Sequence, residues 1–239
     1  MHPCSVALLT LALVKCHALT PKRVLVVGGS GRVGASTVRW IDRLATEQLP
    51  VELAIGGRRR ASFDAAAKRL GAKGVDAIKF VQLDLDDAAS LERAVAGRSL
   101  VVHTAGPFQQ RTDPTLLKAC IDAGVPYCDV CDELELSRAA KKLTSHCDVP
   151  AVISCGIWPG ASALLAARAA ERLGKPLDDL EFSFFTSGTG GAGPTIVSAT
   201  FLLLCTPAAV YADGELVMKE PWTEKRTAAF GPGIGERDV

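Results

Sequence analysis

The sequence predicts an α/β protein built on a doubly wound parallel sheet. Beyond Pro21, short β-branched runs alternate with amphipathic stretches of helical length. Six such runs are each separated by a helical stretch, and this alternation requires parallel strands joined by crossover helices. The composition, 48% hydrophobic and 22% charged, is typical of a globular chain, and 239 residues can form one large domain or two modest ones.

The strands and helices of this domain are predicted in chain order from apolar runs and from residues that typically begin or end a helix. Ser62 is expected to cap the second helix, Gly97 and Gly124 to end the third and fourth, and Asp113-Pro114 to begin the fourth. The strands are expected at residues 24–27, 51–55, 78–82, 100–104, 127–130 and 151–154, and the helices at 35–45, 62–70, 88–96, 113–123 and 134–144.

The segment after residue 155 has a different character and is expected to be an incomplete α+β second domain. A helix is expected at 162–173, a strand at 180–186 and a glycine-rich loop at 188–193. The uncharged stretch 195–212 approaches the length of a membrane span, but its polar residues and Pro207 favour a buried helix packed on a sheet. We therefore divide the chain into a leader or disordered extension (1–21), a dinucleotide-binding domain (22–155) and a partial substrate or dimerisation domain (156–239).

A glycine-rich loop joins the first strand directly to the first helix, as a dinucleotide-binding loop does. Glycine lets the backbone approach a pyrophosphate, and the N–H groups of the helix N-terminus then hold its charge. A nucleotide-triphosphate loop is disfavoured because Ala35-Ser36 follows where its lysine would stand. The expected phosphate-binding residues of this Rossmann fold are Gly28, Gly29, Ser30, Gly31, Arg32, Val33 and Gly34.

The end of the second strand indicates the cofactor. NAD enzymes place an acid there to bind the ribose hydroxyls, whereas this strand runs into Gly57-Arg58-Arg59-Arg60. A guanidinium can bind the 2′-phosphate of NADP with two parallel hydrogen bonds. The sequence therefore predicts NADP rather than NAD, with Arg58 and Arg59 at the adenosine phosphate.

These features resemble the NADP-binding domain of the saccharopine dehydrogenase-like oxidoreductases. The resemblance spans about residues 23 to 165 and implies that Asp84 lies beside the adenine. It also implies that Thr104, Ala105, Gly106 and Pro107 line the nicotinamide ribose. The matching segments are 24–34 (VLVVGGSGRVG), Gly57-Arg58, Asp84, 101–109 (VVHTAGPFQ), 119–133 (ACIDAGVPYCDVCDE) and 155–160 (CGIWPG).

Candidates for catalysis and metal binding are weaker. Short-chain dehydrogenases need a tyrosine with a lysine four residues later, but Tyr127 and Tyr211 are followed at that spacing by Cys131 and Glu215. Cys128 and Cys131 could begin a zinc site, yet no second such pair exists, so no metal site is predicted. His103 is expected to be a packed or surface imidazole. Asp129, at the end of the fifth strand, is the one candidate on the substrate side, and the catalytic acid or base is not identified.

The resemblance implies an NADP-dependent oxidoreductase that transfers hydride between nicotinamide and a small carbonyl, imine or amino-acid-derived substrate. A non-catalytic dinucleotide sensor or interaction protein, inactive through truncation, is the alternative. Residues 230–235 resemble the interior of a domain, so we expect the chain to be a fragment.

The expected partners are a small-molecule substrate and, for the second domain, another copy of the chain in a homodimer. Nucleic acid is not expected because 27 Lys and Arg nearly balance 26 Asp and Glu, and membrane insertion is not expected either. The apolar segment 5–18 leaves two locations open: the cytoplasm, or an organelle or the secretory route reached through this segment.

Overall fold

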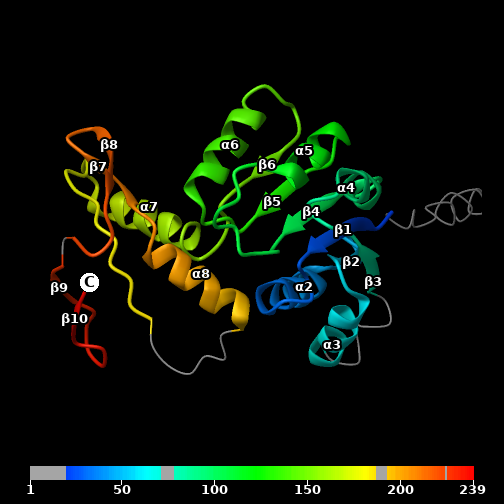
Figure 1. Cartoon of the computed structure of the whole chain (residues 1–239), viewed down its shortest axis with the longest axis horizontal. Helices are drawn as coiled ribbons and strands as arrows, with labels where there is room; N and C mark the ends of the chain where they lie inside the picture. Colours follow the sequence, from blue (N-terminus) through cyan, green and yellow to red (C-terminus); the bar gives the residue numbers. More distant parts are fainter. Residues whose placement is uncertain (1–19, 71–77, 187–192, 224) are drawn as a thin grey trace, which may run out of the picture.

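The computed structural model describes residues 20–70, 78–186, 193–223 and 225–239, so most of the predicted leader and the loop 188–192 lie outside the described residues. A six-stranded parallel sheet forms the centre of the chain, with strand order β3-β2-β1-β4-β5-β6 (Figure 1). This order confirms the doubly wound Rossmann fold. The strands are β1 (Lys22–Val27), β2 (Val51–Gly57), β3 (Lys79–Gln82), β4 (Leu100–His103), β5 (Tyr127–Asp129) and β6 (Ala151–Val152).

Helices cover both faces of the sheet, as the alternation of β1 side chains requires. Val24 and Val26 pack toward Val38 and Phe63 of the first two helices, whereas Leu25 and Val27 pack toward the next three. Burying each of these aliphatic side chains contributes roughly 1.5–3 kcal/mol relative to exposure. The helices are α2 (Arg32–Leu44) and α3 (Arg60–Leu70) on one face, and α4 (Ala88–Val95), α5 (Thr115–Asp122) and α6 (Leu134–Thr144) on the other (Figure 1).

Helix α2 begins at Arg32, three residues before the expected start at residue 35. Two further helix starts differ slightly from the prediction. Helix α3 begins at Arg60 rather than after Ser62, because the Ser62 N–H already donates to Arg59 O at 3.1 Å. Helix α5 is capped by Pro114, with the Thr115 N–H donating to Asp113 O at 3.0 Å. Local turn bonds therefore move each helix boundary by one or two residues, without changing the order of the elements.

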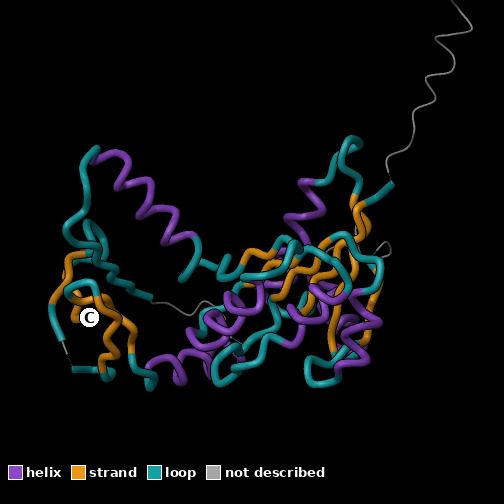
Figure 2. Tube along the Cα trace, turned by 90° about the horizontal axis from the view of Figure 1, so that it is seen from above, coloured by secondary structure: helices purple, strands orange, loops and turns teal. Residues whose placement is uncertain are grey.

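The segment after β6 forms helices and hairpins that lie apart from the six-stranded sheet in both views (Figures 1 and 2). Strands β7 and β8 pair antiparallel, as do β9 and β10. The elements are α7 (Ala161–Leu173), α8 (Pro194–Leu204), β7 (Ala208–Ala212), β8 (Glu215–Lys219), β9 (Thr227–Ala229) and β10 (Glu236–Asp238).

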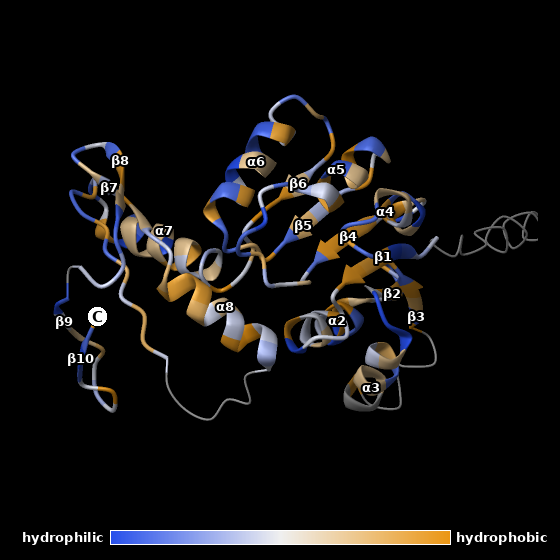
Figure 3. Cartoon of the chain, viewed as in Figure 1, coloured by the Kyte–Doolittle hydropathy of each residue, from blue (hydrophilic) through white to orange (hydrophobic). Residues whose placement is uncertain are grey.

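Two predictions for this segment are wrong. Residues 180–186, all of them described, form no strand, and the apolar stretch beginning at 195 forms helix α8 without a single buried residue. Hydrophobic residues recur along α7 and α8 (Figure 3), and Leu164 and Phe201 are 74% and 67% exposed. The pattern predicted the helix correctly only as far as Leu204, because residues 208–212 form strand β7. Burial also needs a covering surface, which the described part of the chain does not supply. None of its helices is long and apolar enough to span a bilayer.

Candidate dinucleotide-binding site

The loop from β1 to α2 packs directly against the backbone that leaves β4. Gly28 adopts φ +81°, a left-handed conformation that favours glycine, and its N–H donates to Gly56 O at 2.9 Å. A Cβ atom at Gly28 would lie 2.7 Å from both Cα and N of Ala105. The loop can approach β4 this closely only because no side chain stands between them.

The other glycines fold the loop onto the first turn of α2. A Cβ atom on Gly34 would lie 2.3 Å from Gly28 O and 2.6 Å from Gly29 Cα. On Gly29 it would lie 2.8 Å from Ile55 Cγ1 of β2. The loop is therefore a tight backbone cradle at the carboxyl end of the two central strands.

The N-terminus of α2 is suited to an anion. Gly31 is its N-cap, with extended backbone and no side-chain cap, and the first turn contains no acidic residue. The first N–H groups of a helix have no intrahelical acceptor and carry partial positive charge. Ser30, Arg32 and Val33 lie along this turn, and Val33 is half exposed. Phosphate oxygens would complement the partial positive charge of this helix N-terminus.

The three arginines after β2 have different surroundings. Arg60 is already engaged, because its Nε lies 3.0 Å from Asp64 Oδ1 and its guanidinium lies 5.0 Å from the centre of the Phe63 ring. Arg58 and Arg59 are exposed, and their side chains form no hydrogen bond or ion pair with another described residue. The two residues predicted to bind phosphate are therefore the two that keep their charge available.

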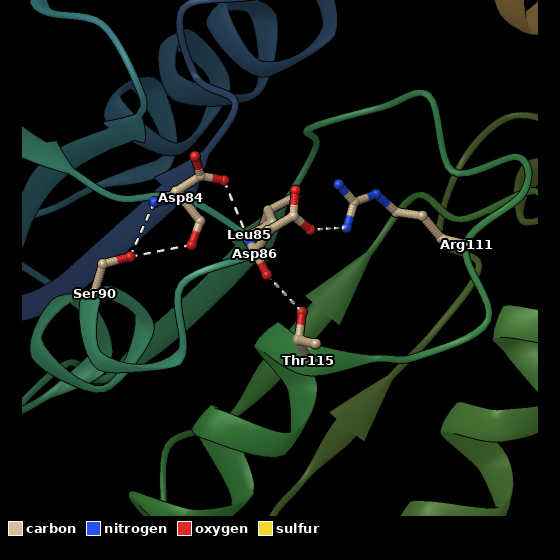
Figure 4. Close-up of polar contacts among 6 residues, drawn as sticks. All are labelled: Asp84, Leu85, Asp86, Ser90, Arg111 and Thr115. Atoms are coloured by element: carbon tan, nitrogen blue, oxygen red, sulfur yellow. Dashed lines mark hydrogen bonds and ion pairs between the residues drawn. The ribbon is translucent and has the colours of Figure 1, made fainter.

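Asp84 begins the turn between β3 and α4, where its backbone is held by the start of the helix (Figure 4). Its N–H donates to Ser90 Oγ at 3.0 Å, and its carboxylate accepts from the Asp86 N–H at 3.2 Å. The Asp84 side chain thus stabilises the same turn that would have to contact the adenine.

Residues 104–107 cross the end of β4 beside the glycine loop. The Thr104 N–H and hydroxyl both donate to Val27 O, at 2.8 and 2.9 Å. The Gly106 N–H donates to Thr104 O at 3.2 Å, and the following Gly106–Pro107 bond is cis. These bonds fix Thr104, Ala105, Gly106 and Pro107 next to the first turn of α2, so the structure brings two of the predicted groups together.

Asp129 ends β5 and is buried. Its Oδ1 accepts from the Ser154 N–H at 2.8 Å and the Cys131 N–H at 3.0 Å, while its carbonyl accepts from the Cys155 N–H. The carboxylate therefore ties the chain leaving β5 to the chain leaving β6. This observation favours a structural role for Asp129 over direct contact with a substrate.

His103, the last residue of β4, is also buried. Its Nδ1 lies 2.9 Å from the Tyr127 hydroxyl, and its ring packs edge-on against Phe108. Burial, reinforced by the positive charge of Arg111, lowers the pKa of His103 to about 4. The imidazole is neutral at pH 7 and is packed inside the domain, which is the first of the two positions that the sequence left open.

The cysteine pair gives no sign of metal or thiolate chemistry. Within the described ranges, no three His, Cys, Asp or Glu side chains gather as metal ligands would. Burial raises the pKa of both Cys128 and Cys131 to about 11, so both are thiols at neutral pH. Cys131 is instead a packed side chain beside Phe108 and Leu136.

Comparison with known proteins gives the family. Residues 24–154, more than half of the chain, match the saccharopine dehydrogenase NADP binding domain. This chain belongs to that family. The match runs from β1 to the end of β6 and so includes the glycine loop, the arginines, Asp84 and residues 104–107. No curated protein matches the full sequence.

The solved structure of a yeast enzyme agrees with this family at the level of fold. The apo saccharopine dehydrogenase (L-Glu forming) of Saccharomyces cerevisiae matches with a TM-score of 0.56 and 16% identity, over 90% of this chain and 48% of that one. A Rossmann-fold NAD(P)-binding protein of Shigella flexneri matches at 0.43 and 17%, over 56% and 66%. The family member described here spans about half the length of the yeast enzyme.

Gln109 and Arg111 are residues of this region that the sequence analysis did not single out. Gln109 is buried with its side-chain amide unpaired among the described residues, and Arg111 forms an ion pair with Asp86 at 3.2 Å. The segment VVHTAGPFQ ends on Gln109, but nothing in its pattern indicates that the amide points inward. Only the folded loop shows this.

Proposed function

We propose that this chain binds NADP across the carboxyl end of its six-stranded sheet. The observation that carries the proposal is the tightly folded glycine loop, in which Cβ atoms at Gly28 and Gly34 would collide with neighbouring backbone, next to an acid-free helix N-terminus. Pyrophosphate would bind to residues 28–34, where backbone and dipole are suited to it. The family description, an NADP binding domain, supports the same cofactor.

The choice of NADP over NAD rests on the loop after β2. Arg58 and Arg59 have no competing carboxylate partner among the described residues, whereas Arg60 does. A 2′-phosphate would supply the missing anion. NAD carries no such group, and no acid stands at the end of β2 to bind its ribose hydroxyls.

We propose further that the bound cofactor serves an oxidoreductase reaction on a small carbonyl, imine or amino-acid-derived compound. NADP supplies hydride transfer at its nicotinamide. Residues 104–107 would hold the nicotinamide ribose against the sheet, and Asp84 would stand beside the adenine. The fold shared with the yeast saccharopine dehydrogenase supports this reaction class.

A second candidate function is a dinucleotide sensor without catalysis. The observation that favours it is the state of the titratable groups beside residues 104–107. His103 is buried and neutral, and the Asp129 carboxylate is bonded to two backbone amides. Neither is poised to exchange a proton with a substrate at the surface.

Turnover measurements separate the two functions. Purified protein would be incubated with NADPH and a panel of α-keto acids, aldehydes and preformed imines, and the oxidation of NADPH would be followed at 340 nm. Calorimetry would measure the affinity for NADPH separately. Binding with turnover supports the oxidoreductase. Binding without consumption across the panel supports the sensor, and absence of binding to NADPH contradicts both.

A further inference from the structure

Four charged side chains gather at the amino edge of the sheet, which is the edge opposite the glycine loop. Arg23 and Glu52 are the second residues of β1 and β2, and they are neighbours in the register of these strands. Lys79 begins β3, and Arg98 lies in the turn before β4. Arg23 stands five residues before Gly28 along the chain, a rise of roughly 16 Å in a strand, so this cluster is separate from the candidate dinucleotide site.

Backbone contacts hold Arg23 against the turn that carries Arg98. The Arg23 N–H donates to Ser99 Oγ at 3.0 Å, and the Ser99 N–H donates to Arg23 O at 2.8 Å. The Arg23 guanidinium lies over Gly97, because a Cβ atom built on Gly97 would be 3.1 Å from Nη1 of Arg23. Gly97 has φ +63°, a conformation that favours glycine. The turn therefore places the side chain of Arg23 beside the residue that precedes Arg98.

The cluster holds more positive charge than it neutralises. Glu52 pairs with Lys79, and among the described residues it is the only carboxylate that pairs with any of the three cations. Arg98 Nε donates to Ala94 O at 3.1 Å, but the terminal nitrogens of Arg98 and Arg23 form no hydrogen bond with a described residue. Three cations and one carboxylate give a formal charge of +2. The other ion pairs in the described ranges each join one cation to one carboxylate.

The two guanidinium groups are close enough to repel each other. Burial of Arg98, followed by the positive charge of Arg23, lowers the pKa of Arg98 below its ordinary value. Lys79, followed by Arg23 and Arg98, lowers the pKa of Glu52. A partly desolvated cation beside a second cation is unfavourable unless an anion compensates. The arrangement therefore favours an anion beside Arg23 and Arg98.

We propose that this amino edge binds a doubly charged oxyanion, such as a phosphate group, through Arg23 and Arg98. A phosphate dianion matches the formal charge of +2, and a guanidinium can bind its oxygens with two parallel hydrogen bonds. Lys79 adds attraction while it stays paired with Glu52. A carboxylate ligand carries one charge and would neutralise only half of the excess. The site is independent of the proposed function, since none of its residues lies at the carboxyl edge of the sheet.

Inorganic phosphate is the probe, titrated into the full chain at constant ionic strength, with the NMR shifts of the backbone amides as the readout. We expect the amides of Gly97, Arg98 and Ser99 to shift and to reach saturation. Glycerol 2-phosphate is titrated in parallel to distinguish two sources of the anion. Saturation by both compounds indicates a site for the phosphoryl group of an organic molecule, and saturation by inorganic phosphate alone indicates a site for the free ion.

Arg98→Gln and Arg23→Gln remove the two guanidinium groups one at a time. Each variant should bind inorganic phosphate at least about 10-fold more weakly than the wild type, because charge-assisted hydrogen bonds are lost. Arg23 is exposed, so Arg23→Gln tests the site without disturbing a partly buried side chain. Neither variant should change the affinity for NADP, which the opposite edge of the sheet would bind.

Arg168→Gln is the matched control, because it makes the same change at an exposed arginine that is paired with Glu171 at 2.7 Å. It should bind inorganic phosphate as the wild type does. The inference is overturned if the shifts of residues 97–99 grow without saturating, or if Arg23→Gln and Arg98→Gln keep the wild-type affinity. Shifts confined to residues 28–34 would also overturn it, because they would place the phosphate at the dinucleotide site.

Discussion

At the scale of single residues, the region beside residues 104–107 is built from polar groups placed inside the domain. His103, Gln109 and Asp129 are all less than a tenth exposed. Asp129 accepts from backbone amides and His103 Nδ1 pairs with one hydroxyl, whereas His103 Nε2 and both Gln109 amide atoms have no hydrogen-bond partner within the described chain. Burial of this kind depends on the packing of Phe108, Tyr127 and their neighbours, which sequence patterns do not resolve.

The neutral state of His103 predicts a specific pH dependence of stability. Its pKa is about 4 in the folded chain against an ordinary 6.5, so below pH 6.5 the unfolded chain binds a proton that the folded chain does not. The free energy of unfolding should therefore fall as the pH drops from 6.5 toward 4, by about 2 kcal/mol at pH 5. Urea unfolding at pH 7.5 and pH 5.0 measures this loss.

Two variants isolate the contribution of His103 from that of other titrating groups. His103→Asn removes the imidazole. Between pH 7.5 and 5.0 its free energy of unfolding should therefore fall by about 2 kcal/mol less than that of the wild type. His146→Gln, an exposed site, should retain the wild-type loss. An unchanged loss in His103→Asn would show that this imidazole is not held neutral by burial.

At the scale of elements, the glycine loop and helix α2 act as one unit. The pattern predicted this unit because Gly28, Gly31 and Gly34 stand between a buried strand and an amphipathic helix. The structure shows why glycine is needed in this loop: the loop contacts the backbone that follows β4 and the first turn of its own helix. The prediction of α8 as a buried helix was wrong, because an uncharged run of residues indicates a helix without indicating what covers it.

The contact at Gly34 predicts the effect of a single methyl group. In Gly34→Ala the new Cβ would stand 2.3 Å from Gly28 O, so the loop must move and the free energy of unfolding should fall by about 1–3 kcal/mol. NADP affinity should fall as well, because the displaced backbone forms the cradle. Thermal or urea unfolding and NADP titration provide the two readouts.

Gly57→Ala is the matched control for stability. A Cβ atom at Gly57, the last residue of β2, meets nothing within 4 Å, so the free energy of unfolding should change by less than about 0.5 kcal/mol. If both variants lose the same stability, the close contact at Gly34 is not what makes glycine necessary there.

At the scale of the whole molecule, the strand order assigns the two halves of the sheet to the two halves of a dinucleotide. The alternation of strands and helices was enough to predict the doubly wound sheet, because parallel strands leave few alternatives once crossovers are right-handed. The segment from α7 to β10 was less predictable. Its hairpins are short, and the apolar side chains of its helices stay exposed, so burial patterns give little guidance there.

We propose that the whole chain binds NADP through its glycine loop and selects it through Arg58 and Arg59. Calorimetric titration with NADP and NAD, on the wild type and on the double variant Arg58→Ala/Arg59→Ala, tests this selection. Arg60→Ala is the control, because the Arg60 side chain is already paired with Asp64. We predict at least about 10-fold weaker NADP binding in the double variant, from the loss of charge-assisted bonds, with NAD binding unchanged and Arg60→Ala like the wild type. Equal loss for both cofactors, or no loss for either, would contradict the account.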